Sequence, residues 1–304
     1  MRREVGMVWQ RFIRQRLVAR FLIGTVLAML LAVQGVAQLA NLADLTASPF
    51  LDTPLLGAQL GRLFAVVFCL VLQGCLMIAA PLLAMGIYTD DPLPAHMSPT
   101  RLLARLLAIW GLLLTAGMVS APFFSILPLF GSLTLLEIGW ALAVVLITAL
   151  VSGAYSICCI TLLRNLPSAL VAAYGFLFLW EVITVLVATA RLSPPASIII
   201  VAFNPFTSLL ATLAPAFPPT GPIAAYLDTL LQFTHGTIDP ALPLYRLYVA
   251  GSGLLILLFI GIAGVAVRPR PRRWHRFDTL MSSLGVLYLI GLWLGREWWL
   301  IALS

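Results

Sequence analysis

Glu181 is the one ionisable side chain that falls deep inside a long apolar stretch of this 304-residue sequence, in the run FLFLWEVITVL. A charge at that depth in a bilayer is costly, so such a carboxyl is normally paired, protonated or facing water. Two interpretations stay open: a polar point on a substrate or proton path, or a protonated carboxyl bonded to a neighbouring helix. The candidate partners in other apolar stretches are Gln34, Gln38 and Gln73.

A second group of residues that could take part in chemistry or binding lies in the segment Ala84–Ala108. This segment separates two long apolar stretches. Its charged and helix-starting residues are Asp90, Asp91, Ser98, Pro99, Arg101 and Arg105. Serine followed by proline is the pattern of a helix N-cap and first turn, so a helix should begin at Pro99. The two arginines are four residues apart and therefore share a helix face, where they could meet acidic groups of a partner. Ordinary anchoring of a cytoplasmic loop explains them equally well.

Several enzymatic classes lack their required residues. All 18 basic side chains are arginines, so the chain has neither a P-loop lysine nor a Schiff-base lysine. The three histidines lie in expected loops, and no H-E-x-x-H or G-x-S-x-G motif occurs. We therefore expect a protein that is not itself an enzyme and has no metal or cofactor site of its own.

The four cysteines, Cys69, Cys75, Cys158 and Cys159, all lie within apolar stretches. Cysteine in such a setting is a small packing residue. The adjacent pair Cys158–Cys159 leaves a redox role open as an alternative.

Composition places the chain in a membrane. It is 62% hydrophobic and 10% charged, with a mean hydropathy of +1.05, whereas a soluble domain carries about 25% charged residues. The net charge of +7 is explained by arginines that hold loops on the cytoplasmic side, so we expect no nucleic-acid partner.

Runs of about 20 apolar residues mark the expected membrane-spanning helices. They are Phe21–Leu42, Leu63–Tyr88, Leu102–Phe130, Ile138–Leu163, Ser168–Ala190 and Leu247–Val267, with a shorter seventh at Leu280–Leu294. The basic N-terminus predicts a cytoplasmic start, and alternation then puts Asp90–Arg105, Arg164 and Arg268–Arg276 on that same side.

Three domains follow from this layout: an interfacial amphipathic helix over residues 1–20, a six-span domain over 21–267, and a basic loop with a C-terminal hydrophobic helix over 268–304. The long basic segment favours an uncleaved first helix over a signal peptide. Between spans five and six, the apolar stretch Ala196–Phe217 is broken by Pro205 and Pro215. Neither half can span, which predicts short re-entrant helices in the outer leaflet.

In its order of features the chain resembles the ABC-2 family of transporter permeases, the membrane subunits of ATP-binding-cassette exporters. GRLFAVVFCLVLQGCLMIAAPLLAMGIYTDD (Gly61–Asp91) looks like the family's second helix with its charged exit. SAPFFSILPLFGSLTLLEIGW (Ser120–Trp140) looks like the third helix, the outer turn and the start of the fourth. LVSGAYSICCITLLRNLPSALVAAYGFLFLW (Leu150–Trp180) looks like the fourth helix, a short turn and the fifth.

The resemblance implies an all-α, six-span exporter subunit in the plasma membrane of a prokaryote. A separate ATPase subunit would bind ATP and dock on the first cytoplasmic loop, and a second permease copy or paralogue would complete the channel. The loop here is short and keeps only Ser98–Pro99 of the family's usual turn. Alternatives from other classes are a non-transport membrane protein, such as an assembly factor or sensor, and an ion-coupled carrier that uses Glu181.

Overall fold

The computed structural model describes residues 16–46, 53–90, 98–120, 134–189, 199, 202–213, 243–268 and 275–300. Within these residues the chain forms helices and no β-strand, so the predicted all-α class is confirmed. The helices are α2 (Arg16–Thr46), α3 (Thr53–Asp90), α4 (Pro99–Val119), α6 (Leu135–Leu163), α7 (Leu166–Thr189), α9 (Pro205–Leu213), α11 (Leu244–Ala266), α12 (Arg276–Leu294) and α13 (Arg296–Leu300).

Five of the described helices contain a stretch long and apolar enough to cross a membrane: α3 through Ala65–Tyr88, and the whole of α4, α6, α11 and α12. Shorter apolar stretches lie in α2 and α7. The chain is therefore a multi-pass membrane protein by the character of its helices. Each predicted span overlaps a described helix. The six- or seven-span arrangement remains a prediction.

Several predicted span boundaries differ from the ends of the described helices, and two of these differences have a local structural cause. The third span was expected to run to Phe130, but α4 ends at Val119, because the Ser120 hydroxyl and N–H both bond the carbonyl of Gly117 and close the helix. The short seventh span was expected to begin at Leu280, but α12 begins at Arg276. There Asp278 and the backbone of His275 form a capping box that starts the helix four residues earlier.

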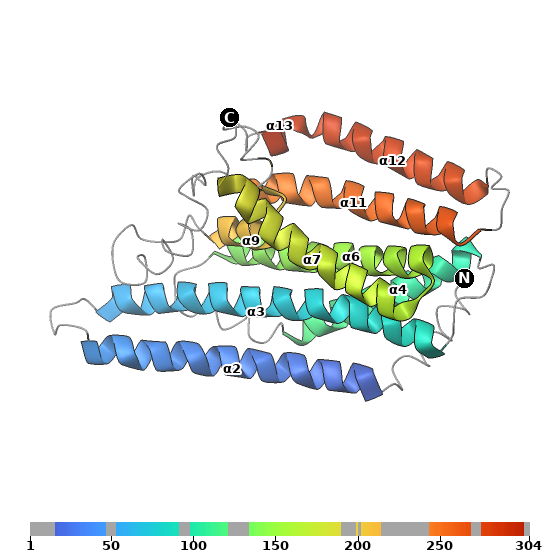
Figure 1. The fold of residues 1–304 in the computed structure, drawn as a ribbon. Coiled ribbons are helices and arrows are strands. Elements are labelled where there is room, and N and C mark those ends of the chain that lie inside the picture. The colour runs from blue at the N-terminus through green and yellow to red at the C-terminus, as the bar shows by residue number, and fades with distance from the viewer. Residues whose placement is uncertain are drawn as a thin grey trace.

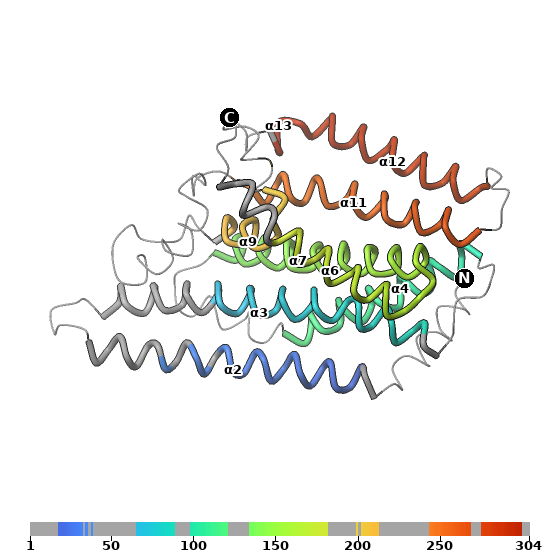
Figure 2. Tube along the Cα trace, viewed as in Figure 1, coloured from blue at the N-terminus to red at the C-terminus, as the bar shows by residue number. Residues whose placement is uncertain are grey.

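The helices lie side by side as a bundle with alternating direction (Figures 1 and 2). The helix α6 is its centre and packs against α3, α4, α7, α9 and α11. Small residues in its second half allow this, since buried Ser152, Gly153, Ala154 and Ser156 let neighbouring helices approach closely. At Gly153 the indole of Trp110 fills the space that a side chain would occupy, and its Nε1 donates to the carbonyl of Leu150 at 2.9 Å.

The two ends of the bundle differ in chemistry. One end, here called the arginine end, holds the starts of α2, α4, α7 and α12 and the ends of α3, α6 and α11 (Figure 1). Its described basic residues are Arg20, Arg101, Arg105, Arg164, Arg268 and Arg276. The opposite end, the aromatic end, carries Trp140, whose ring lies 5.1 Å from that of Tyr245 and 5.6 Å from that of Trp298. Clustered tryptophan and tyrosine are typical of a membrane–water interface.

Aromatic side chains of α12 pack directly against glycines of α11. A Cβ atom on Gly253 would overlap the Tyr288 ring of α12, and one on Gly264 would overlap the Phe277 ring. The Tyr288 hydroxyl also donates to the carbonyl of Ala250 at 2.8 Å. These contacts hold α12 against α11, although most of the other apolar side chains of α12 are exposed, as expected for a lipid-facing helix.

The expected interfacial helix over residues 1–20 lies largely outside the described residues, which begin within it at Arg16. Of the expected re-entrant helices, α9 is a short helix between α7 and α11 in the chain, and it packs on α3, α6 and α11. A second short helix after it would fall outside the described residues. The predicted boundary at residue 267, between the six-span domain and the C-terminal segment, falls directly after the end of α11.

Candidate functional site: a buried polar chain and the arginine end

A chain of buried polar side chains crosses three helices in the middle of the bundle. Gln73 of α3 donates through Nε2 to the Thr148 hydroxyl of α6 at 3.3 Å. The Thr148 hydroxyl lies 2.7 Å from the Tyr248 hydroxyl of α11. All three side chains are fully enclosed, each with 0% of its surface exposed. Because a buried polar group without partners is strongly disfavoured in an apolar bundle, this set fixes the register of α3, α6 and α11.

Glu181 lies beside this chain, at the junction of α7 and α9. The Asn204 side chain, directly before α9, interacts with the Glu181 carboxyl, and its Nδ2 donates to the Glu181 carbonyl at 3.3 Å. The neighbouring Trp180 donates through Nε1 to the carbonyl of Phe203 at 2.8 Å, and its ring stacks on that of Tyr248 at 6.4 Å. The carboxyl is therefore held inside protein, with Oε1 closed off from solvent.

Sequence reasoning missed Asn204 and named Gln34, Gln38 and Gln73 as candidate partners of Glu181. Of these, Gln73 belongs to the polar chain, where its Nε2 donates to Thr148. The signal for Asn204 was present in AFNPFTSLL, since asparagine before proline is a helix N-cap pattern. The Asn204 Oδ1 accepts from the N–H groups of Phe206 and Thr207 at 2.9 and 3.0 Å. Its role as a cap is what places it against α7.

The predicted start of α4 is confirmed. Ser98 has an extended backbone and its hydroxyl accepts from the N–H of Arg101 at 3.4 Å, while Pro99 occupies the first turn. From there α4 runs without a break into the bundle. Asp90 is the last residue of α3, and Asp91 lies outside the described residues.

Arg101 and Arg105 differ in their surroundings, although they share α4. Arg101 is exposed. Arg105 has only 2% of its surface exposed, and its guanidinium lies over the Tyr88 ring of α3, 4.4 Å from the ring centroid. Burial removes Arg105 from any surface that a partner could touch, so Arg105 cannot play the predicted contact role, and for the exposed Arg101 that role stays a prediction. Arg105 instead joins the start of α4 to the end of α3.

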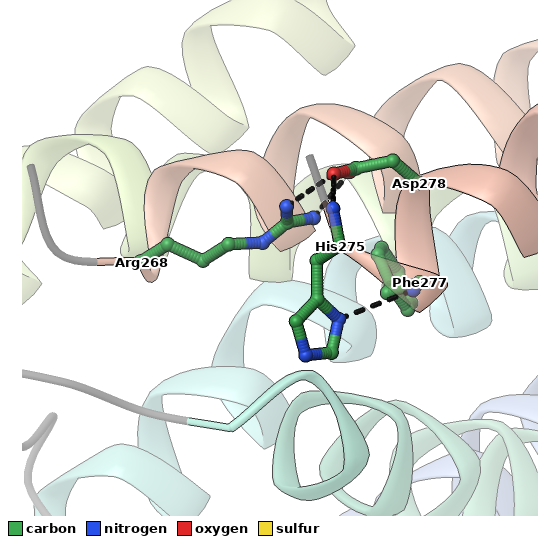
Figure 3. A network of polar contacts seen from close by, with 4 residues as sticks. All are labelled: Arg268, His275, Phe277 and Asp278. Atoms are coloured by element: carbon green, nitrogen blue, oxygen red, sulfur yellow. Dashed lines mark hydrogen bonds and ion pairs between the residues drawn. The ribbon is translucent and has the colours of Figure 1, made fainter. Parts of the chain in front are cut away.

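A polar clamp joins the end of α11 to the start of α12 at the same end of the bundle (Figure 3). The Arg268 guanidinium donates a hydrogen bond from each terminal nitrogen to the Asp278 carboxylate. The Asp278 Oδ2 also accepts from the backbone N–H of His275 at 2.9 Å. The hydrogen bond to Asp278 raises the pKa of Arg268 above its usual value. A two-pronged pair of this kind fixes geometry as well as charge, so the clamp sets the position at which α12 returns along α11.

The structure keeps the candidate groups apart. Asn204 directly precedes α9 and bonds Glu181, whereas Ser98 and Arg101 are at the start of α4. The helix α9 and the start of α4 lie toward opposite ends of the bundle (Figure 1). The four cysteines are free, and Cys69, Cys158 and Cys159 are buried, which fits packing residues. Within the described part of the chain, no three histidine, cysteine or acidic side chains gather as metal ligands would.

Comparison with family models, with curated proteins and with solved structures finds no match for this chain.

Proposed function

We propose that the chain is the membrane-spanning permease subunit of an ATP-binding-cassette exporter, and that a separate ATPase subunit drives it. The observation that carries the proposal is the construction of the α4 start. Ser98 and Pro99 begin a helix whose first turn carries the exposed Arg101. One turn later, Arg105 is buried against Tyr88 of α3.

This arrangement supports a coupling role for a mechanical reason. A force on the first turn of α4 has no flexible joint to absorb it, since the helix continues from Pro99 into the apolar bundle. The Arg105–Tyr88 contact passes the displacement to α3, which packs on the central helix α6. A partner that changes shape on ATP binding could thus move the bundle by displacing the first turn of α4.

The resemblance to ABC-2 permeases supports the same assignment, because such permeases dock their ATPase on the loop before the third span. The absence of lysine means that this chain has no Walker motif, so ATP would be bound by the partner. A second permease copy or paralogue would complete the path across a prokaryotic plasma membrane, with the N-terminus and the arginine end in the cytoplasm.

The test is site-specific photo-crosslinking in native membranes. A photo-reactive amino acid in place of Arg101 should capture a soluble protein, and the purified adduct should hydrolyse ATP. The matched control carries the same amino acid in place of Leu135, which is exposed at the aromatic end of α6 and should capture no ATPase. Capture of an ATPase from both positions, or from neither, contradicts the proposal.

The buried polar groups favour a second candidate, an ion-coupled carrier. Glu181 is held beside Asn204 and next to the Gln73–Thr148–Tyr248 chain, and intramembrane carboxyls commonly mark ion paths. Proton uptake into vesicles that contain the purified chain, without any ATPase, would distinguish the two candidates. Glu181→Gln should abolish such uptake, while Glu297→Gln, at an exposed position near the aromatic end, should leave it unchanged.

A further inference from the structure

A groove of about 470 Å³ opens between α11 and α12, on the halves of both helices that lie nearest the arginine end. The end of α6 contributes Leu162 to its wall. The lining is mainly apolar and includes Leu258, Gly261, Ile262, Val265 and Met281. Both helices are long and apolar enough to span a membrane, so a lipid hydrocarbon chain is the ligand that suits this groove.

The groove is a fixed feature of the helix pair. A Cβ atom on Gly261 would meet nothing within 4 Å, so this glycine faces open space. In contrast, Gly253 and Gly264 are closed over by Tyr288 and Phe277, which set the spacing of α11 and α12. The Arg268–Asp278 clamp holds the turn between the two helices.

The exposed side chain of Arg164 lies at one end of the groove. Ala266 lines the groove, and its carbonyl accepts a hydrogen bond from the Arg164 guanidinium at 3.4 Å. Arg164 is exposed and has a φ of 53°, the left-handed conformation that favours glycine and asparagine. It closes α6 there and ends up beside the groove. Arg268 is paired with Asp278, so among the described residues beside the groove Arg164 and the exposed Arg276 are the arginines without an acidic partner.

We propose that this groove binds an anionic phospholipid, with one acyl chain along α11 and α12 and the headgroup phosphate held by Arg164. Both halves of such a lipid are matched, the chain by the apolar walls and the phosphate by a guanidinium at their end. A protein occupant would need an acidic group aligned with Arg164 as well as an apolar ridge. The lipid site does not depend on whether the chain exports a substrate.

The experiment counts the lipids retained by the full chain. The protein is purified from nanodiscs with equal amounts of phosphatidylglycerol and phosphatidylcholine, and native mass spectrometry identifies the lipids that remain bound. The wild type should retain phosphatidylglycerol in preference. Arg164→Asn should weaken that retention about fivefold, the effect of losing one arginine at a lipid surface. Asparagine tolerates the left-handed backbone, so α6 should still end normally.

Two control pairs make the result specific. Arg296→Gln removes an exposed arginine at the aromatic end and should leave retention unchanged. Gly261→Phe should fill the groove and abolish retention, whereas Gly139→Phe, also at a glycine facing open space, should not. Equal retention of the two lipids, or retention that survives Gly261→Phe, overturns the proposal. So does a wild-type dimer that Gly261→Phe converts to monomer, because the groove would then seat a second copy.

Discussion

The Arg105 guanidinium lies over the Tyr88 ring, 4.4 Å from its centroid, and joins the first turns of α4 to the last residues of α3. Stacking of arginine on an aromatic face is strongest when the pair is removed from water, and here both side chains are almost fully buried. The contact thus couples the two helices that flank the segment around Asp91.

Loss of this stacking should destabilise the bundle. We expect Arg105→Ala to lower the free energy of unfolding in detergent by about 2 kcal/mol, since the pair is desolvated. Arg101→Ala should change it by less than about 0.5 kcal/mol because Arg101 is exposed. Thermal unfolding of both variants checks this, with Tyr88→Leu added to complete a double-mutant cycle. Additive effects of the Arg105 and Tyr88 changes would show that the stacking contributes nothing.

The buried hydroxyl of Thr148 should matter more than an exposed one. Thr148→Val removes the group that contacts both Gln73 and Tyr248, and it should lower the free energy of unfolding by about 1 kcal/mol. Thr115→Val is the matched control, because the Thr115 hydroxyl is exposed and, among the described residues, donates to the Gly111 carbonyl of its own helix. Equal loss in the two variants would count against a structural role for the polar chain.

The two glycines Gly264 and Gly261 should respond in opposite directions. Gly264→Ala places a Cβ inside the Phe277 ring and should lower the free energy of unfolding by about 1–3 kcal/mol. Gly261→Ala meets open space and should be neutral or stabilising by up to about 1 kcal/mol, since alanine favours a helix. Phe277→Leu should partly rescue Gly264→Ala, and a failure of rescue would place the strain elsewhere.

The clamp at the α11–α12 turn should control how firmly α12 docks. Asp278→Asn removes one charge of the Arg268 pair. We expect it to broaden the distance between spin labels on the exposed Leu258 of α11 and Leu284 of α12, measured by pulsed electron paramagnetic resonance. Glu297→Gln, outside the clamp, should leave the distribution as narrow as in the wild type. An unchanged distribution in Asp278→Asn would mean that the aromatic contacts alone hold α12.

The arginine end should face the cytoplasm. A membrane-impermeant maleimide should label Arg101→Cys only in inside-out vesicles, and Leu135→Cys only in right-side-out vesicles, because arginine-rich loops stay on the cytoplasmic side. The half-buried Cys75 is first replaced by alanine to keep background labelling low, since the other cysteines, Cys69, Cys158 and Cys159, are buried. The reverse labelling pattern would invert the proposed orientation and remove Arg101 from reach of a cytosolic ATPase.

The sequence by itself determined the features that depend on local composition. Apolar runs of spanning length predicted where the long helices lie, since the backbone must satisfy its own hydrogen bonds in lipid. Ser98–Pro99 predicted the start of α4, because an N-cap is a local interaction between residues three apart. The distribution of arginines predicted one basic side. Arg101, Arg164, Arg268 and Arg276 lie at the starts of α4 and α12 and just after α6 and α11, which meet at one end of the bundle (Figure 1).

Tertiary structure alone decided which polar groups meet. Arg101 and Arg105 look equivalent in the sequence, yet one is exposed and the other is buried, because only Arg105 faces Tyr88. Glu181 lies near Asn204, 23 residues away, and Thr148 meets Tyr248 100 residues away. Such pairings depend on how the helices pack and rotate against one another, which no pattern along a single helix encodes.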